Sequence, residues 1–383
     1  MAHAIRGWVL KPALNSPLNS RTCNYLGGSG CVGKMGSFLN GDSSPMELYG
    51  GIDLHSNNSY IGIINEENSV MYKDRRRNEL PSILSALAPY KGELKALAVE
   101  STFNWYWLVD GLMDAGYPVH LANPAAMKEY KGLKHKDDKK SALWLANLLR
   151  LKILPEGYIY PKEERPVRDL LRKRLHLVRH RTSHILSIKN IISRNLGMTI
   201  KGDDIKTLTS RDIERLITDE CHRLAITASL STIHHLTSQI KQIEKTILGR
   251  VRLRDEFKGL TGMPGIGTTL GLTIMLEVGD IRRFTEVGNY ASYCRCVMSI
   301  RTSNDKKTGE GNRKNGNKYL SWAYIEAAHM AKRYCPSLRK YYEKKAAKTN
   351  KIVATKAVSH KLARASYYVM RDQAVFDEKR LFG

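Results

Sequence analysis

The sequence predicts an α/β domain followed by an all-α region. Between residues 48 and 122, short β-rich runs alternate with helical stretches, which is the pattern of a mixed sheet flanked by helices. Beyond Pro155, apolar residues recur at three- and four-residue spacings, as they do on the buried face of a helix. The chain has 383 residues, of which 42% are hydrophobic, so it can form two or three domains with real cores.

Residues 1–45 differ from the rest of the chain. They are rich in Gly, Ser and Asn and show neither helical nor strand periodicity. We expect a disordered tail. Because Met46 stands directly before the first clean strand, the alternative is that translation starts there and that residues 1–45 are not part of the natural protein.

Residues 46–155 carry the expected sheet. Three strand-like runs are separated by polar turns and predict an antiparallel meander, and alternating helices and strands follow. Together these elements predict the RNase H arrangement. The expected strands are Leu48–Asp53, Tyr60–Ile64, Val70–Lys73, Leu94–Val99 and Val119–Ala122, and the expected helices lie near 79–88, 104–115 and 138–152.

Residues 156–252 predict a basic helical arm. A first long helix combines a Leu and Ile stripe with many Lys and Arg residues, and a second helix is expected over about 210–250. Two such helices form an antiparallel coiled-coil arm, although a plain structural spacer has the same pattern. The basic face of the first helix repels itself unless phosphates neutralise it, so we expect nucleic-acid contacts from Arg172, Lys173 and Arg174.

Residues 253–383 predict a mainly α C-terminal domain. It opens with a Pro-Gly-Ile-Gly motif at residues 264–267, a helix-hairpin-helix-like segment in which Gly265 and Gly267 turn backbone N–H groups toward a phosphate. Tight helix packing explains these glycines equally well. Cys294 and Cys296 lack a second ligand pair at zinc-finger spacing, so we expect packing residues rather than a metal site or a disulfide framework.

The net charge favours nucleic acid as a partner. The chain has 62 Lys and Arg against 37 Asp and Glu, which gives +25, and a field of this size attracts polyanions. We expect DNA; a generally basic soluble protein and one that meets anionic lipid are the alternatives. No apolar run approaches the roughly 20 residues of a membrane-spanning helix, and no convincing signal peptide is present. A cytoplasmic protein is therefore expected.

Two acidic residues end two of the predicted strands. Asp53 ends the first and Glu100 ends the fourth, so parallel pairing would bring both carboxylates to one edge of the sheet. A hard dication such as Mg²⁺ relieves the repulsion between them and can bind a scissile phosphate. Asp137 or Asp138 would add a third acid at the start of the next helix, although an acidic residue there also stabilises a helix N-terminus.

Ser303 precedes a stretch rich in Lys, Gly and Asn. Residues 304–318 predict a mobile cationic loop whose amides and side chains meet phosphates. A serine presented there can attack phosphorus once its proton is removed and charge is neutralised, although most loop serines are simply solvated. The phosphate-binding candidates in this loop are Lys306, Lys307, Arg313 and Lys314.

Taken in order, the motifs resemble the insertion sequence 110 family of transposases and the related Piv-type DNA invertases. The resemblance covers about residues 47–375 and rests on six stretches whose joint occurrence by chance is remote. These are Gly51-Ile52-Asp53, Val99-Glu100-Ser101-Thr102, Asn123-Pro124-Ala125, Lys136 to Ala146, Pro264-Gly265-Ile266-Gly267 and Ser303 to Leu320.

The resemblance implies a RuvC-like domain with an Asp-Glu-Asp-Asp set and a transposase domain with a nucleophilic serine. Asp53, Glu100 and Asp138 match the first three acids, which would hold Mg²⁺ or another divalent cation, and Ser303 matches the serine that joins DNA covalently. It also implies a structured bridge RNA as guide, and a homo-oligomer, a dimer or tetramer, whose active sites combine different protomers. Such a protein would act at the nucleoid of a bacterial or archaeal cell.

One position departs from the family pattern. The fourth acid is expected three residues after Asp138, where this chain has Ser141, and a hydroxyl brings no negative charge to a cation. Weaker metal binding follows. A catalytically impaired nucleic-acid-binding remnant is therefore one alternative to a DNA recombinase. A RuvC-like junction nuclease, in which water attacks and Ser303 plays no part, is another.

Overall fold

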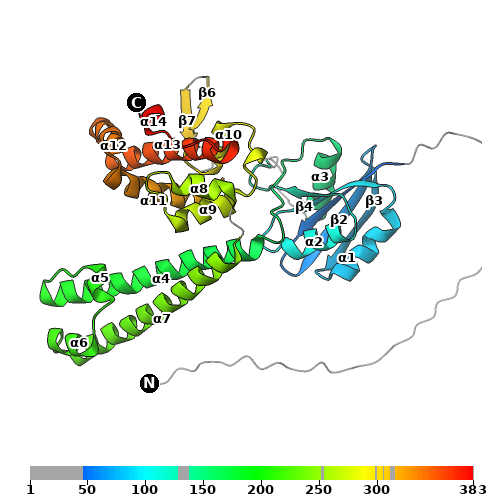
Figure 1. Ribbon diagram of the computed structural model, residues 1–383. Helices are drawn as coiled ribbons and strands as arrows, with labels where there is room; N and C mark the ends of the chain where they lie inside the picture. Colours follow the sequence, from blue (N-terminus) through cyan, green and yellow to red (C-terminus); the bar gives the residue numbers. More distant parts are fainter. Residues whose placement is uncertain are drawn as a thin grey trace, which may run out of the picture. The chain divides into compact units, whose positions relative to one another are not determined.

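The structure, a computed structural model, describes most of the chain (Figure 1). The described residues are 46–127, 138–251, 254–297, 300–304, 306–310 and 315–382, and from Met46 onward they belong to one compact unit. In these ranges no helix combines the length and the apolarity needed to cross a membrane. The tail expected at residues 1–45 lies outside the described residues.

A five-stranded mixed sheet forms the first part of this unit, as the sequence predicts. Its strand order is β3-β2-β1-β4-β5; β1, β2 and β3 pair antiparallel, whereas β1, β4 and β5 are parallel. The arrangement is consistent with an RNase H-like domain. The strands are β1 Leu48–Leu54, β2 Asn58–Asn65, β3 Val70–Arg77, β4 Leu94–Glu100 and β5 Val119–Ala122.

Helices cover both faces of the sheet. The face that carries Ile52, Ile61 and Val99 packs against α1 and α2, and α3 packs on the opposite face. The backbone of α3 lies very close to β1 at Gly51. A Cβ atom on Gly51 would lie only 2.1 Å from the carbonyl oxygen of Ala142. The helices are α1 Leu80–Leu87, the 3-10 turn η1 Ala88–Tyr90, α2 Tyr106–Asp114 and α3 Asp138–Arg150.

Two long helices, α4 and α7, lie side by side (Figure 1). Arg174 donates from Nε to Glu244 Oε1 at 2.8 Å, and Arg181 donates from Nη1 to Thr237 Oγ1 at 3.2 Å, so the two helices run in opposite directions. Two short helices and a cluster of buried isoleucines complete one end of the pair. The bounds are α4 Arg165–Leu196, α5 Gly202–Ile205, α6 Ser210–Leu216 and α7 Glu220–Arg250.

The prediction of one helix over about 210–250 is wrong, because the chain breaks between α6 and α7. Thr209 and Asp212 cap the start of α6 through reciprocal side-chain and backbone hydrogen bonds. Asp219 caps the start of α7, where its Oδ1 accepts from His222 N at 2.8 Å. Each cap satisfies backbone N–H groups that have no partner inside the helix, so two separate helices start within this stretch.

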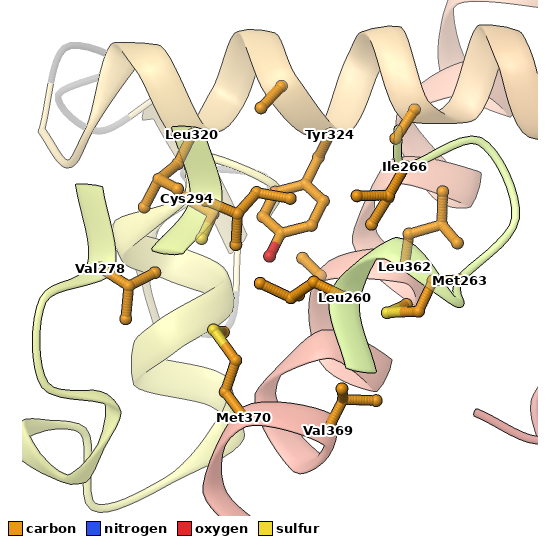
Figure 2. Close-up of a cluster of buried hydrophobic side chains, with 14 of the residues drawn as sticks. Leu260, Met263, Ile266, Val278, Cys294, Leu320, Tyr324, Leu362, Val369 and Met370 are labelled. Atoms are coloured by element: carbon orange, nitrogen blue, oxygen red, sulfur yellow. The ribbon is translucent and has the colours of Figure 1, made fainter. Parts of the chain in front are cut away.

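The remaining described residues are mainly helical and form a core, to which Leu171 of α4 and Ile247 of α7 also contribute (Figure 2). Leu260, Tyr324, Leu362 and Met370 pack together there, and buried Tyr290 and Tyr324 share a hydrogen bond of 2.6 Å. The elements are α8 Asp255–Thr261, α9 Thr268–Val278, η2 Ile281–Arg283, α10 Val287–Tyr293, β6 Ile300–Ser303, β7 Lys306–Glu310, α11 Lys318–Tyr334, α12 Pro336–Lys348, α13 Lys351–Asp372 and α14 Glu378–Phe382.

Cys294 and Cys296 are buried in this C-terminal core. Burial raises the pKa of the Cys296 thiol to about 12, because the protein interior disfavours the thiolate. The thiolate is the form that binds metals. The burial of both side chains therefore supports their interpretation as packing residues.

Candidate functional site

Asp53 and Glu100 occupy adjacent positions at the carboxyl edge of the sheet. Ile52 of β1 pairs with Val99 of β4 in parallel register, and Asp53 and Glu100 are the next residues on the two strands. Because neighbouring strands are about 4.8 Å apart, the backbones of the two acidic residues are close together. The parallel pairing that the sequence predicts is confirmed.

Both acidic side chains project from the face that α3 covers. Gly51 faces α3, since its Cβ position meets Ala142, and Asp53 lies two residues further along the same strand. Side chains alternate between the two faces of a strand, so Asp53 shares the face of Gly51. Val99 packs on the opposite face with α1 and α2, so Glu100, the next residue, also belongs to the α3 face.

Helix α3 runs antiparallel to β1. Ala142, in the first half of the helix, packs over Gly51. Arg150, at the end of the helix, donates from Nη1 to the carbonyl oxygen of Glu66 at 2.8 Å, and Glu66 follows the end of β2 that pairs with the start of β1. The start of α3 therefore lies toward the carboxyl end of β1.

This direction brings the backbone of Asp138 to the edge that carries Asp53. Asp138 is one helical turn before Ala142, and Asp53 is two residues beyond Gly51; each step spans about 6 Å. The side chain of Asp138 lies outside the described residues, as does all of Asp137. Ser141, which stands where a fourth acid is expected, is half-buried.

Asp53 is held in a largely buried position. Its side chain is one of the few buried charged groups in the described chain, with 4% of the residue exposed. Nε2 of His55 lies 3.6 Å from Asp53 Oδ2. A carboxylate that has lost most of its water needs a compensating positive charge or hydrogen-bond donors, and this edge offers it a neighbouring imidazole.

Two asparagines fix the chain between β1 and β2. The carbonyl oxygen of His55 accepts from Asn78 Nδ2 at 2.8 Å and from Asn104 Nδ2 at 3.2 Å. Asn104 Oδ1 accepts in turn from Thr102 Oγ1 at 2.8 Å. Sequence reasoning missed both asparagines; the available signal for Asn104 was its place four residues after Glu100.

The donor set at this edge fits a hard dication. Carboxylate oxygens are the ligands that Mg²⁺ prefers, and Asp53 and Glu100 supply two carboxylates from one face. Among the residues that the structure describes, no group of three His, Cys, Asp and Glu side chains is placed to hold a metal ion. The side chain of Asp138, the third candidate, is not part of that set.

Ser303 is the last residue of β6, at the turn of a β-hairpin. It pairs with Lys306 of β7, and Asn304 in the turn has a φ of 50°. Asparagine tolerates this left-handed conformation better than most residues, and two-residue hairpin turns require it. The prediction of a mobile loop directly after Ser303 is thus wrong for residues 306–310, which form a strand. The Ser303 and Lys307 side chains, and all of Arg313 and Lys314, lie outside the described residues.

The segment after the hairpin is anchored at Asn317. Its Oδ1 accepts hydrogen bonds from backbone N–H groups in the first turn of α11, and its Nδ2 donates to Glu277 Oε2 at 2.7 Å. Glu277 also binds Arg172 of α4, so the end of the segment that starts at Ser303 is connected to a long helix. Sequence reasoning missed Glu277 and Asn317. The available signal for a buried ion pair was that Glu277 is the one charged residue of the apolar helix α9.

Two of the three arm residues expected to bind nucleic acid have protein partners instead. Arg172 binds Glu277 through Nε and Nη2, at 2.6 and 2.7 Å, and Arg174 binds Glu244. Carboxylates neutralise both guanidinium groups, which leaves less of their charge for phosphate contacts. Lys173, between the two, is exposed.

Gly265 and Gly267 have different surroundings. Gly265 has a φ of 81°, and a Cβ atom there would lie 2.3 Å from the carbonyl oxygen of Ala327 on α11, so helix packing requires glycine at this position. Gly267 is exposed before the first turn of α9, and a Cβ atom there would meet nothing within 4 Å. Packing accounts for Gly265, whereas the backbone at Gly267 is open to solvent.

Two family models match the chain in sequence order. The model for DEDD transposases of IS110, described as "Transposase", matches residues 50–194, and the model described as "Transposase IS116/IS110/IS902 family" matches residues 258–343. The first match includes Asp53, Glu100 and Asp138, and the second includes Ser303. The chain belongs to the IS110 family of transposases. Membership of this family supports an enzymatic role in DNA cleavage and recombination.

Individual relatives agree with this assignment. The transposase for insertion sequence element IS1111A of Coxiella burnetii is 22% identical over 291 residues, which are 74% of this chain and 78% of the relative. An uncharacterized IS110 protein of Streptomyces coelicolor is 26% identical over 32% of this chain and 30% of its own length. An uncharacterized IS116 protein of Streptomyces clavuligerus is 28% identical over 44% of this chain and 39% of its own length. The matches to the two Streptomyces proteins thus span less than half of those relatives.

The IS110-family matches leave two longer parts of the described fold uncovered. Residues 195–257, which include α5, α6 and α7, lie between the two matched stretches, and residues 344–382, which include α13 and α14, follow the second. The family resemblance therefore concentrates on the sheet, on α4 and on the stretch from α9 to α11 that contains Ser303.

Proposed function

We propose that this chain is the transposase of an insertion sequence and breaks and rejoins DNA as a site-specific recombinase. The family match supports the proposal. The observation that carries it is that Asp53 and Glu100 lie side by side on the sheet face where α3 begins. Two carboxylates at one sheet edge are suited to hold a divalent cation against a scissile phosphate.

In this proposal Asp53, Glu100 and Asp138 hold Mg²⁺ or another divalent cation. When bound, the cation stabilises negative charge that develops on the reacting phosphate. The protein fixes the ligands: paired strands place Asp53 and Glu100, and the amides of Asn78 and Asn104 hold the chain that follows β1. A site fixed before the substrate arrives needs little rearrangement during the reaction.

Ser303 is the proposed nucleophile. Its Oγ attacks a backbone phosphorus, the P–O bond to the departing DNA end breaks, and the serine proton is transferred to the departing oxygen, which leaves as a hydroxyl. The resulting serine phosphodiester keeps the bond available for rejoining to a second DNA end. The position of Ser303 at a hairpin turn, paired with the exposed Lys306, supports access to DNA.

DNA is the proposed substrate, and a structured guide RNA and further copies of the chain are the proposed partners. The net charge of +25 supports binding of polyanions. We also propose a division into parts at residues 46–155, 156–252 and 253–383. Separate hydrophobic clusters in the sheet domain and at one end of the arm support it, whereas the third cluster also includes Leu171 and Ile247 of the arm. The proposed nucleic-acid contacts are Lys173, Lys306, Lys307, Arg313, Lys314 and the backbone at Gly267.

Ser141 favours a second candidate function. A site with three carboxylates instead of four binds a divalent cation less tightly, because affinity follows the charge of the ligands. A chain with such a site can persist as a nucleic-acid-binding protein with little or no catalysis. The third candidate, a junction nuclease, uses the same carboxylates but water in place of Ser303.

Trapping of covalent protein–DNA adducts tests the proposal. The full-length protein is incubated with Mg²⁺, RNA transcribed from beside its gene and a duplex that spans one end of the element, and adducts are separated by denaturing electrophoresis. We expect adducts from the wild type and from the neighbouring-hydroxyl control Thr302→Ala. Ser303→Ala should give none and should bind the RNA nearly as well as the wild type. Adducts from Ser303→Ala would move the nucleophile elsewhere, and DNA cleavage by the wild type without adducts would favour the nuclease.

A further inference from the structure

A row of side chains crosses the sheet from Asp53 to the edge strand β3. Asp53 of β1 pairs with Tyr60 of β2, and Tyr60 pairs with Arg75 of β3. Directly opposed residues on paired strands project from the same face, so Tyr60 and Arg75 share the face of Asp53, on which α3 begins. Arg77, two residues further along β3, belongs to that face as well.

The two arginines on this face are exposed and keep their donors available. Cζ of Arg75 lies 5.7 Å from the centroid of the Tyr60 ring, a contact that favours one position of the guanidinium group. Both Arg75 and Arg77 are exposed, and among the described residues neither forms an ion pair with a carboxylate. Arg76, between them, belongs to the opposite face, where its Nη2 lies 2.9 Å from Asp74 Oδ2.

The position of β3 explains only part of this pattern. It is an edge strand of the sheet, and charged residues on an edge strand prevent pairing with other chains. That reason applies equally to both faces. It does not explain why a carboxylate neutralises Arg76, whereas the arginines on the face of Asp53 and Glu100 have no such partner.

We propose that Arg75 and Arg77, with Tyr60 as a platform, bind a backbone phosphate of the DNA strand next to the phosphate that reacts. This inference rests on the proposed function, in which Asp53 and Glu100 flank the reacting phosphate. The backbone of Arg75 is two strands, about 10 Å, from that of Asp53. A guanidinium group binds phosphate oxygens through two parallel hydrogen bonds. The two arginines are thus positioning residues, which hold the strand in register with the carboxylates.

Neutralisation of single phosphates tests the contact directly. The full-length Ser303→Ala protein binds the duplex without chemistry, and one phosphate at a time around the cleavage position is replaced by an uncharged methylphosphonate. We expect one replacement to weaken binding about tenfold. The same replacement should have little effect when Arg75→Ala is also present, because that contact is already lost. If every replacement has the same effect with and without Arg75, the proposed contact does not exist.

Arg76→Ala is the matched control, because it removes the same charge from the same strand on the opposite face. Binding is measured at several salt concentrations. We expect Arg75→Ala to lower the slope of log K against log salt by about one, and Arg75→Ala with Arg77→Ala by about two. Arg76→Ala should change the slope much less. Equal slopes for Arg75→Ala and Arg76→Ala would show that only net charge matters and would overturn the proposal. Because Arg75 is exposed, its loss should leave Tm unchanged.

Adduct formation separates this inference from the proposed function. Adducts from the wild type, together with an Arg75→Ala protein whose phosphate map and salt slope are unchanged, would overturn the positioning role and leave the recombinase in place. Absence of adducts from the wild type would count against the recombinase, whereas the phosphate map would still report the contact. If Arg75→Ala weakens binding of the flanking RNA but not of the duplex, the assignment to DNA is wrong.

Discussion

Arg172 on α4 and Glu277 on α9 form a bidentate ion pair, with Nε–Oε1 and Nη2–Oε2 distances of 2.6 and 2.7 Å. The Glu277 side chain is 2% exposed, so its charge is stabilised by protein groups rather than by water. Those groups are Arg172 and Asn317, which also caps α11. One buried carboxylate therefore connects three helices, including the one that follows the Ser303 segment.

Glu277→Gln should destabilise the protein. The substitution keeps the shape of the side chain but removes the charge that holds the donors of Arg172 and Asn317, and we expect a loss of about 2 kcal/mol in the free energy of unfolding. Urea denaturation measures this change. The control is Glu286→Gln, in which an exposed carboxylate is replaced and no loss is expected. Equal stability of Glu277→Gln and the wild type would show that the pair does not hold these helices together.

The carboxylate edge could be predicted because short stretches of neighbouring residues identify both of its strands. Asp53 and Glu100 each end a short apolar run, and parallel strands bring their carboxyl ends to one edge. The partners of Arg172 and Arg174 could not be predicted, because Glu277 and Glu244 lie 105 and 70 residues away along the chain. A basic helix has the same sequence pattern whether its charges meet phosphates or distant carboxylates.

The hairpin at Ser303 was missed for a different physical reason. Residues 306–310 are Lys-Lys-Thr-Gly-Glu, which lack the alternation of apolar and polar residues that predicts a strand. Pairing with β6 makes them a strand, since backbone hydrogen bonds do not depend on side-chain type. Asn304, a residue that tolerates positive φ, was the available signal for the turn.

Alkylation of the folded protein should distinguish the cysteines. Among the four cysteines that the structure describes, Cys221 is exposed, whereas Cys294, Cys296 and Cys335 are buried. Burial raises the pKa of the Cys294 and Cys296 thiols, so they contain little of the reactive thiolate at neutral pH. Of these four, we expect iodoacetamide to modify Cys221 in the folded protein and the buried three only after unfolding in urea, as followed by peptide mass spectrometry. Rapid labelling of Cys296 in the folded protein would contradict its packing role.

Gly51→Ala should displace α3 from the sheet. The new Cβ atom would lie 2.1 Å from the carbonyl oxygen of Ala142 and 2.8 Å from the nitrogen of Ala146, and backbone atoms cannot move aside as a flexible side chain can. We expect a loss of about 3 kcal/mol in the free energy of unfolding, together with fewer Mg²⁺-dependent adducts, because Asp138 begins this helix. Gly92→Ala is the control, since a Cβ atom there meets nothing within 4 Å. If Gly51→Ala matches this control in both measurements, close packing of α3 is not needed.

Ser141→Asp should strengthen divalent-metal binding at the carboxylate edge. Residue 141 lies three positions after Asp138 on α3, and positions with this spacing are neighbours on the surface of a helix. A fourth carboxylate adds negative charge where the proposed cation binds, and we expect half-maximal adduct formation at about tenfold less Mg²⁺. Titration of Mg²⁺ measures this value.

The control for this prediction is Ser141→Asn, which has nearly the same shape as the aspartate variant but no charge. Its Mg²⁺ requirement should stay close to that of the wild type, because an amide oxygen adds a ligand without the attraction of a full charge. If the aspartate and asparagine variants need the same Mg²⁺ concentration, then residue 141 does not face the cation. In that case the absence of the fourth acid does not limit this chain, and the impaired-remnant alternative loses the observation that favours it.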